Sequence, residues 1–261
     1  MKKEREHLFF ESFGSHNNPP IILIHGLFGS WENLKFIAKN LEDTFHVICP
    51  DCRNHGRSFH DPCMTYDEMA SDIEHLVSHL NLNQPIIIGH SMGGKIAMQL
   101  NLREHLRINK LIVIDIAPRK YPQHHLGILN ALKTLNLNNI KNKTQAAEAL
   151  ATDIPSVELR QFLIKNIERT NETYMWKINL DAIFDQYHII CDFPVHKKQL
   201  HTPSLFIRGT RSNYIEKNDE HVIQELFSDA IFCDIDASHW VHAENPKKTL
   251  STIQNFLNIP E

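Results

Sequence analysis

The stretch Ile86-Ile87-Ile88-Gly89-His90-Ser91-Met92-Gly93-Gly94 decides the fold. It contains the pattern Gly-x-Ser-x-Gly, between an apolar run typical of a buried strand and a helix-compatible segment. In this strand–turn–helix context the pattern forms a nucleophile elbow. The glycines support this interpretation, because a serine at so sharp a turn has a strained backbone and side chains beside it would collide. We therefore predict that Ser91 is a nucleophile at a helix N-terminus, where partial positive charge favours a developing anion.

Short apolar runs alternate with amphipathic stretches along the rest of the chain, as in a parallel sheet covered by helices. The predicted strands are 21–24, 47–49, 86–88, 111–114, 205–207 and 231–235, and the predicted helices are 31–41, 66–80, 92–102 and 246–257. Each strand run is rich in β-branched residues and too short for a helix. The pattern predicts an α/β protein.

The spacing between strand runs breaks once, between Ile114 and Leu205. A crossover between parallel strands needs only about a dozen residues, yet this stretch shows no convincing strand. Helices are predicted instead at 126–135, 144–151, 157–167 and 178–186. We predict that residues 120–200 form a helical cap inserted into a sheet domain made of residues 1–119 and 201–261, because long insertions in such sheets usually cover the site.

Composition excludes several classes of function. The chain has 261 residues, with 27 basic and 31 acidic side chains and a formal net charge of -4, so it lacks the basic excess that a nucleic-acid partner requires. No apolar run approaches the roughly 20 residues of a membrane span, and the charged start of the chain does not resemble a secretory signal. We expect a cytoplasmic protein, with monomer and homodimer both left open.

Neither the cysteines nor the histidines suggest a cofactor or a metal. The five cysteines are scattered and odd in number, which predicts free thiols in a reducing compartment. Cys49 and Cys52 form a C-x-x-C pair, but Pro50 and a polar loop follow where a redox motif would open a helix. His75 and His79 lie one helical turn apart without a third ligand. We expect a solvated helix face there, and neither a metal nor a cofactor.

A serine hydroxyl needs a base to remove its proton. In proteins with this elbow the order along the chain is serine, acid, histidine, so the histidine should follow the last strand. The strand run 231–235 leads into Asp236-Ala237-Ser238-His239-Trp240. We therefore predict that His239 is the base.

The acid that orients His239 is ambiguous in the sequence. Its usual place is the loop after the run 205–207, but that loop has no carboxylate before Glu216, and Ser212 stands where an aspartate is expected. Asp115 directly follows the run 111–114, at the sheet edge where the site must lie. A carboxylate at the end of a buried strand needs a hydrogen-bond donor as its partner, such as an imidazole N–H. We predict Asp115 rather than Glu216, with Ser212 either a hydrogen-bonding neighbour of Asp115 or His239, or a plain turn serine.

Two backbone N–H groups are needed to bind the oxyanion of a tetrahedral intermediate. One should come from Met92, which follows the nucleophile. The other should come from the loop His25-Gly26-Leu27-Phe28-Gly29-Ser30, where we predict Leu27 and keep Phe28 as the alternative. A phosphate-cradling loop is excluded, because neither G-x-G-x-x-G nor a Walker lysine is present.

These motifs together resemble the α/β-hydrolase superfamily, from about Pro20 to the end of the chain. The resemblance is carried by HGLFGS at 25–30, DCRNHGRS at 51–58, GHSMGG at 89–94 and SHWVHAENP at 238–246. In the second block, Asp51 and Arg53 are interpreted as structural. HGLFGS combined with Ile114-Asp115-Ile116-Ala117-Pro118 resembles the YbfF-type bacterial esterases and the abhydrolase-domain-11 hydrolases. That resemblance implies an acid matching Asp115, a nearby serine matching Ser212, and hydrolysis of short to medium acyl esters or acyl-CoA thioesters.

The function predicted from the sequence is therefore a serine hydrolase of the α/β-hydrolase fold, which cleaves carboxylic esters through an acyl-enzyme and needs no cofactor. Two alternatives stay open: a carbon–carbon bond hydrolase with the same triad, and a non-catalytic ligand-binding protein of the same fold. We expect Phe28, His90 and Trp240 to line the substrate pocket. Some apolar cap residues should line an acyl pocket above Ser91; the candidates are Leu126, Leu129, Phe162, Leu163, Met175, Trp176 and Phe184.

Overall fold

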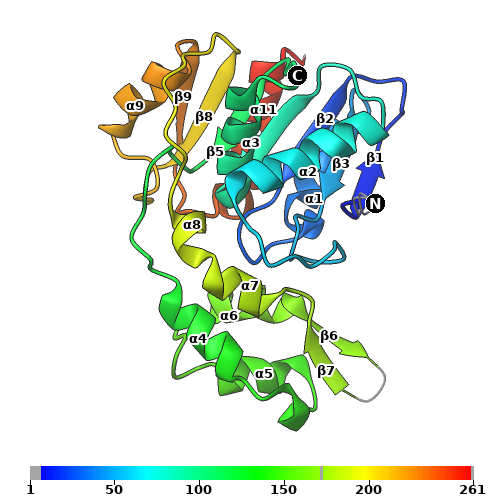
Figure 1. Ribbon diagram of the computed structural model, residues 1–261, viewed down its shortest axis with the longest axis vertical. Coiled ribbons are helices and arrows are strands. Elements are labelled where there is room, and N and C mark those ends of the chain that lie inside the picture. The colour runs from blue at the N-terminus through cyan, green and yellow to red at the C-terminus, as the bar shows by residue number, and fades with distance from the viewer. Residues whose placement is uncertain (1–6, 171–172, 260–261) are drawn as a thin grey trace.

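The computed structural model describes residues 7–170 and 173–259. Its centre is a seven-stranded sheet with the strand order β1-β3-β2-β4-β5-β8-β9 (Figure 1). The strands are β1 (Phe10–Phe13), β2 (Pro20–Ile24), β3 (His46–Pro50), β4 (Ile86–His90), β5 (Leu111–Ile114), β8 (Ser204–Gly209) and β9 (Ala230–Ile235). All neighbours pair in parallel except β1 and β3, which are antiparallel. The predicted fold class and all six predicted strands are confirmed.

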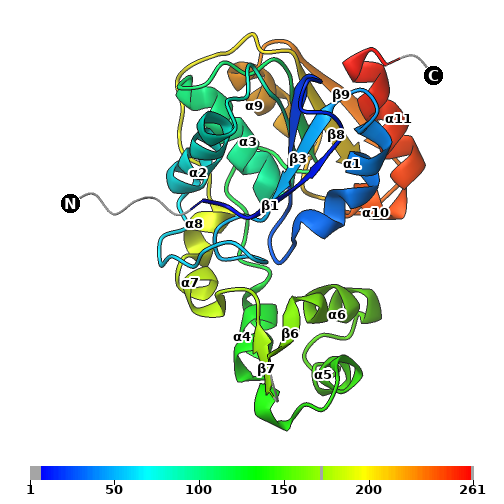
Figure 2. The same cartoon turned by 90° about the vertical axis from the view of Figure 1, so that its right-hand side faces the viewer.

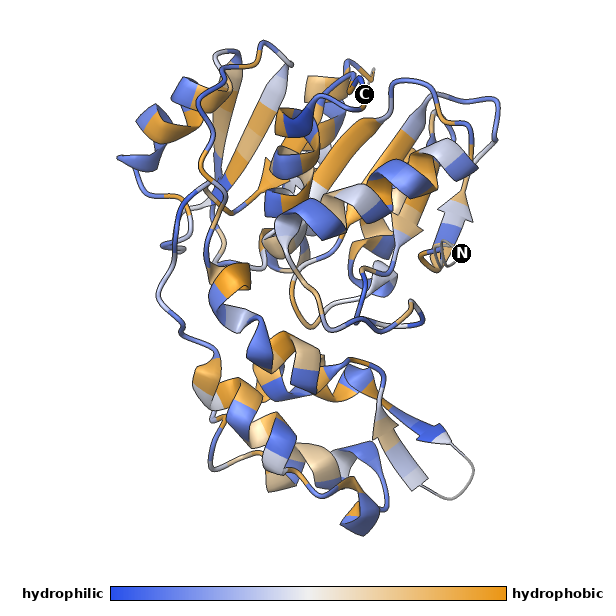
Figure 3. Cartoon of the chain, in the orientation of Figure 1, coloured by the Kyte–Doolittle hydropathy of each residue, from blue (hydrophilic) through white to orange (hydrophobic). Residues whose placement is uncertain are grey.

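Helices cover both faces of the sheet (Figure 2). One face carries α1 (Lys35–Leu41) and α11 (Pro246–Leu257), and the other carries α2 (Tyr66–His79) and α3 (Met92–Arg103). Two separate apolar clusters result, one on each face. Because β2 to β5 are buried on both faces, their residues are mostly apolar, with His46 and His90 at the ends of β3 and β4. Figure 3 shows these strands in orange between helices with blue outer surfaces. The four predicted core helices are present, although 31–41 begins with a 3-10 turn, η1 (Trp31–Leu34).

Three smaller elements of the core were not predicted. Strand β1 is a half-buried edge strand with only four residues, so its alternation is too short to detect. Helices α9 (Asp219–Leu226) and α10 (Val241–Glu244) are also short, and α10 immediately follows the loop that carries His239. All five cysteines are unpaired thiols, as expected. Within the described residues, no helix combines the length and the apolar character that crossing a membrane requires.

The segment between β5 and β8 forms a separate layer of helices below the carboxyl edge of the sheet (Figure 1). It contains α4 (Leu126–Thr134), η2 (Leu137–Asn139), α5 (Lys143–Ala149), α6 (Val157–Leu163), η3 (Ile164–Asn166), α7 (Leu180–Asp185) and α8 (Tyr187–Cys191). The two stems of this segment meet, because the Tyr121 N–H donates to the Cys191 carbonyl at 2.9 Å.

The expectation that this segment lacks strands is wrong. Strands β6 (Ile167–Thr170) and β7 (Thr173–Trp176) pair in antiparallel fashion. Three of the four residues of β6 are exposed, so the strand has no apolar run, and it directly follows helical periodicity. Strand recognition from buried apolar runs fails for such a surface hairpin.

A buried ion pair fixes the loop after β3. Arg53 donates from Nε to Asp72 Oδ2 at 2.6 Å and from Nη2 to Asp72 Oδ1 at 2.8 Å, and both side chains are only 3% exposed. The Asp51 carboxylate accepts the backbone N–H groups of Trp31 and Arg57. Both residues thus support the loop structure, as interpreted from the sequence.

Breaking this pair should destabilise the fold. Asp72→Asn removes the buried counter-charge of Arg53 and leaves only the more exposed carboxylates of Glu68 and Asp61, at 3.4 and 3.7 Å. We therefore expect a loss of about 2–4 kcal/mol, below the cost of a fully unpaired buried charge. Glu42→Gln removes the exposed Lys39–Glu42 pair and should change stability by less than about 1 kcal/mol. Urea denaturation of both variants tests this, and equal losses would contradict the structural role of the buried pair.

Candidate active site

The turn between β4 and α3 presents Ser91 at the carboxyl edge of the sheet. Ser91 has φ 52° and ψ −120°, and its N–H donates to the Ile114 carbonyl at 3.0 Å. The turn needs glycine at position 93, because a Cβ there would lie 2.2 Å from the Ile24 carbonyl oxygen. Phe28 and Asp115 also have positive φ, 61° and 53°. Strained backbone at three such close positions is typical of functional sites.

His239 lies between Ser91 and Asp115. Its Nε2 is 2.9 Å from Ser91 Oγ, and its Nδ1 is 2.8 Å from Asp115 Oδ2. An ionised carboxylate only accepts, so Nδ1 carries the proton and Nε2 is left to accept the proton of Ser91. Three residues distant in sequence therefore form one continuous hydrogen-bonded chain.

Asp115 is fully buried at the end of β5 and uses both carboxylate oxygens. Oδ1 accepts the Gly209 N–H at 2.9 Å, and Oδ2 accepts the Ser212 hydroxyl at 2.5 Å in addition to His239. Glu216, the alternative acid, is 60% exposed and faces Arg119 instead. The structure thus brings Asp115 to the imidazole and Ser212 to Asp115, and it leaves Glu216 outside.

The two candidate oxyanion donors, Leu27 and Met92, lie on the two loops beside Ser91. Among the described residues neither N–H has a protein acceptor. The alternative donor, Phe28, is occupied, because its N–H donates to His55 Nε2 at 3.1 Å. Burial lowers the pKa of His55 to about 3, and its Nδ1–H donates to the Arg53 carbonyl, so Nε2 is free to accept. This geometry favours Leu27 over Phe28.

Further rings hold His239 in place. Tyr214 stacks on its imidazole, with centroids 3.8 Å apart and planes 20° apart. His90 Nε2 donates to the His239 carbonyl at 2.9 Å. Burial lowers the pKa of His90 well below its usual value, and that of His242 behind it to about 4. His90 thus acts as a neutral hydrogen-bonding ring and His242 as a neutral packing ring against it, with centroids 4.4 Å apart, roles that the sequence did not reveal.

A cavity of about 520 Å³ lies between this constellation and the cap. Its lining includes Phe28, His90 and Trp240, the three residues expected at a substrate pocket. Of the seven apolar cap candidates only Phe162 reaches it, joined by Ile128 and Leu159. The other six do not; they are Leu126, Leu129, Leu163, Met175, Trp176 and Phe184. Leu129 and Leu163 are fully buried within the cap, because helices this small need them for their own packing.

His125 also lines the cavity and was missed in the sequence, because the cap carries no motif. Burial lowers its pKa to about 4. Within residues 7–170 and 173–259, no group of three or more His, Cys, Asp or Glu side chains is arranged to hold a metal ion.

Comparison with known proteins identifies the family. The sequence profile described as the alpha/beta hydrolase fold matches residues 19–246. The chain belongs to this family. It is 36% identical over 245 residues to Esterase YbfF of Escherichia coli, covering 93% of this chain and 94% of that one. It is 38% identical over 253 residues to the sn-1-specific diacylglycerol lipase ABHD11 of Danio rerio, covering 94% and 80%.

A solved structure titled "Marine microorganism esterase" superposes with a TM-score of 0.93 at 39% identity, covering 97% of this chain and all of the other. The resemblance derived from the motifs is confirmed. Membership of the α/β-hydrolase family, together with these relatives, supports a hydrolase of the esterase and lipase type.

The close approach at the elbow should make Gly93 intolerant of a side chain. Gly93→Ala should destabilise the fold by about 1–3 kcal/mol, because the added methyl group meets backbone rather than a movable side chain. Gly127→Ala in α4 is the matched control, since a Cβ there meets nothing within 4 Å and should stabilise by about 0.5–1 kcal/mol. Chemical denaturation measures both, and opposite signs are the expected result.

Proposed function

We propose that this protein hydrolyses short- to medium-chain carboxylic esters with Ser91 as nucleophile, His239 as general base and Asp115 as the orienting acid. The observation that carries the proposal is the chain of two hydrogen bonds, 2.9 and 2.8 Å, from the Ser91 hydroxyl to a fully buried carboxylate. A structural role alone does not require a serine with strained backbone at the end of such a chain.

In the proposed reaction, Ser91 Oγ attacks the acyl carbonyl carbon while His239 Nε2 takes its proton. The carbonyl oxygen becomes an oxyanion and accepts hydrogen bonds from the Leu27 and Met92 N–H groups. Collapse of the intermediate breaks the bond to the alcohol, which leaves with the proton from His239. Water then attacks the acyl-enzyme, gives its proton to His239 and releases the acid, and that proton returns to Ser91.

The names of the relatives support ester substrates, since one is an esterase and one a diacylglycerol lipase. The proposal includes thioesters, because the same steps expel a thiol and the machinery contacts only the acyl carbonyl and the leaving atom. We further propose that residues 120–200 act as the cap that shapes the substrate cavity, and that no cofactor takes part.

Replacing the nucleophile should abolish activity without unfolding the protein. Ser91→Ala should lower kcat by about 10⁴-fold or more, and it should no longer react with a fluorophosphonate probe. Ser251→Ala, a serine on the remote helix α11, should keep both activity and labelling. Retention of more than a few per cent of activity by Ser91→Ala, with unchanged circular dichroism, would rule out the proposed nucleophile.

Three variants test the acid. Asp115→Asn should favour the wrong imidazole tautomer and lower kcat by up to about 10⁴-fold. Ser212→Ala should cost about 1.5–3 kcal/mol of transition-state stabilisation, as one charge-assisted hydrogen bond is lost. Glu216→Gln should change little, because its carboxylate is exposed. The measurement is kcat/KM on one activated ester, and the reverse ranking of Asp115→Asn and Glu216→Gln would contradict the assignment.

A further inference from the structure

The turn that carries Leu27 and Phe28 has a strained backbone. The Gly29 N–H donates to the Gly26 carbonyl at 3.0 Å and closes the turn. Phe28, its third residue, has φ 61°, a conformation that turns usually give to glycine or asparagine. Strain of this kind persists only where the surrounding structure fixes the backbone.

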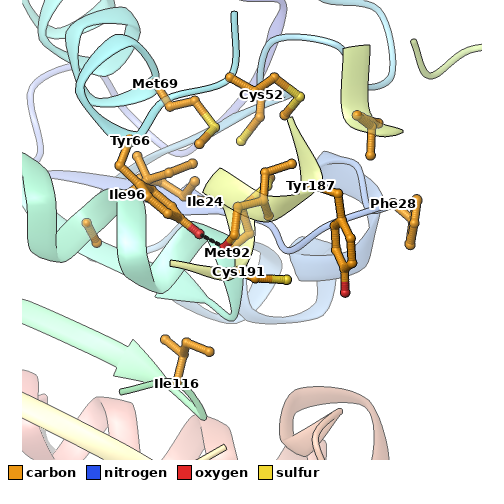
Figure 4. Close-up of a cluster of buried hydrophobic side chains, with 14 of the residues drawn as sticks. Ile24, Phe28, Cys52, Tyr66, Met69, Met92, Ile96, Ile116, Tyr187 and Cys191 are labelled. Carbon is orange, nitrogen blue, oxygen red and sulfur yellow. Dashed lines mark hydrogen bonds between the residues drawn. The ribbon is translucent and has the colours of Figure 1, made fainter. Parts of the chain in front are cut away.

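The Phe28 side chain explains why a phenylalanine stands at this position. It is only 5% exposed and belongs to the apolar cluster drawn in Figure 4, together with Met92 and Tyr187. Its ring meets the ring of His125, in the cap, edge to face, with centroids 6.3 Å apart. Side-chain packing thus accounts for the residue type, and other groups must hold its backbone in the strained conformation.

Asn166 of η3 supplies one of those groups from the cap. Its Nδ2 donates to the Phe28 carbonyl at 2.7 Å and, over a longer distance, to the Leu163 carbonyl at 3.3 Å. Both partners are carbonyl oxygens, so the amide must present its NH₂ group to them. Asn166 is only 3% exposed, and a buried amide that loses its acceptor is costly. The contact with Phe28 is therefore firmly held.

The bond reaches the oxyanion site through two peptide groups. The N–H and C=O of a trans peptide point in opposite directions, so a bond to one end directs the other. Asn166 holds the carbonyl of the Phe28–Gly29 peptide, whose N–H holds the carbonyl of the Gly26–Leu27 peptide. The N–H of that second peptide belongs to Leu27, the proposed oxyanion donor. Hydrogen bonds in such a chain also polarise one another, which strengthens the last donor.

We propose that Asn166 is a positioning residue for hydrolysis, which directs the Leu27 N–H at the oxyanion through this chain. The inference rests on the proposed function, because it needs Leu27 as an oxyanion donor. It gives the cap a part in the chemical step, in addition to shaping the cavity. The oxyanion site is complete only while η3 is docked on the turn.

The expected effect is moderate, because the Gly26 carbonyl has a second donor. The Nδ1–H of His25 also donates to it, at 2.8 Å. Loss of an oxyanion donor itself lowers kcat by about 10²–10³-fold, so loss of a group that acts through the donor should cost about tenfold.

Asn166→Leu tests the proposal on a p-nitrophenyl ester, since leucine keeps the branched shape of the side chain and removes the donor. We expect kcat to fall about tenfold while KM changes less than about twofold, because the turn acts in the transition state rather than in substrate binding. Asn166→Ala is the second variant should the first not fold.

A trifluoromethyl ketone gives a readout that a purely structural role would not change. Ser91 Oγ adds to its carbonyl carbon and passes its proton to His239, which leaves an oxyanion where the tetrahedral intermediate has one. The affinity of the Asn166 variants for this ketone should therefore also fall about tenfold.

Asn179→Ala is the matched control. Asn179 also links the cap to the rest of the protein, from its Nδ2 to Asn54 Oδ1 at 3.2 Å, but it contacts the loop after β3 rather than the turn at 26–29. This variant should lose stability in urea without a change in kcat or in affinity for the ketone.

The outcomes separate this inference from the proposed function. Asn166 variants that lose only stability, or that raise KM at unchanged kcat, would overturn the inference and leave the proposed function standing. Wild-type protein that hydrolyses no ester and shows no fluorophosphonate labelling of Ser91 would overturn the proposed function, and this inference with it.

Discussion

The close packing of α3 against β2 and β4 is the constraint on which the site depends. At Gly93 the helix backbone lies so near the Ile24 carbonyl that no side chain fits between them. This contact fixes the direction of α3, and with it the positions of Ser91 and the Met92 N–H. The loop that continues β2 then brings Leu27 to the same point. One backbone contact thus positions the nucleophile and both candidate oxyanion donors.

Burial keeps several histidine rings of the core neutral. Desolvation lowers the pKa values of His25, His55, His90 and His242, so all four rings are neutral. The first three also make hydrogen bonds. His25 shows the result: its Nδ1–H donates to the Gly26 carbonyl, and its Nε2 accepts the Cys52 N–H. Two loops are joined in this way by a ring that carries no charge.

Much of this arrangement was predictable, because buried parallel strands and sharp turns leave strong patterns in sequence. The run 111–114 ending in Asp115, and the last strand ending before His239, are sufficient to place both residues at one sheet edge. The elements and contacts that were not predicted lack such a sequence pattern. Strand β1 and the β6–β7 hairpin bury too little to show apolar runs. The tertiary contact that occupies the Phe28 N–H, and the cap side chains that reach the cavity, depend on how distant segments pack.

The hydrogen bond between Tyr121 and Cys191 has a consequence for how such proteins diversify. The two stems of the inserted segment are already in contact. Strands β5 and β8 are therefore connected as if by a short closed loop, whatever the length or sequence of the segment between the stems. Loop closure costs little more free energy as a loop grows, so helices between the stems are free to be lengthened, exchanged or reshaped without disturbing strand register. The proposed role of the cap in substrate selectivity is thereby separated, in evolutionary terms, from the residues on the sheet, and the segment between Tyr121 and Cys191 is the natural unit of exchange.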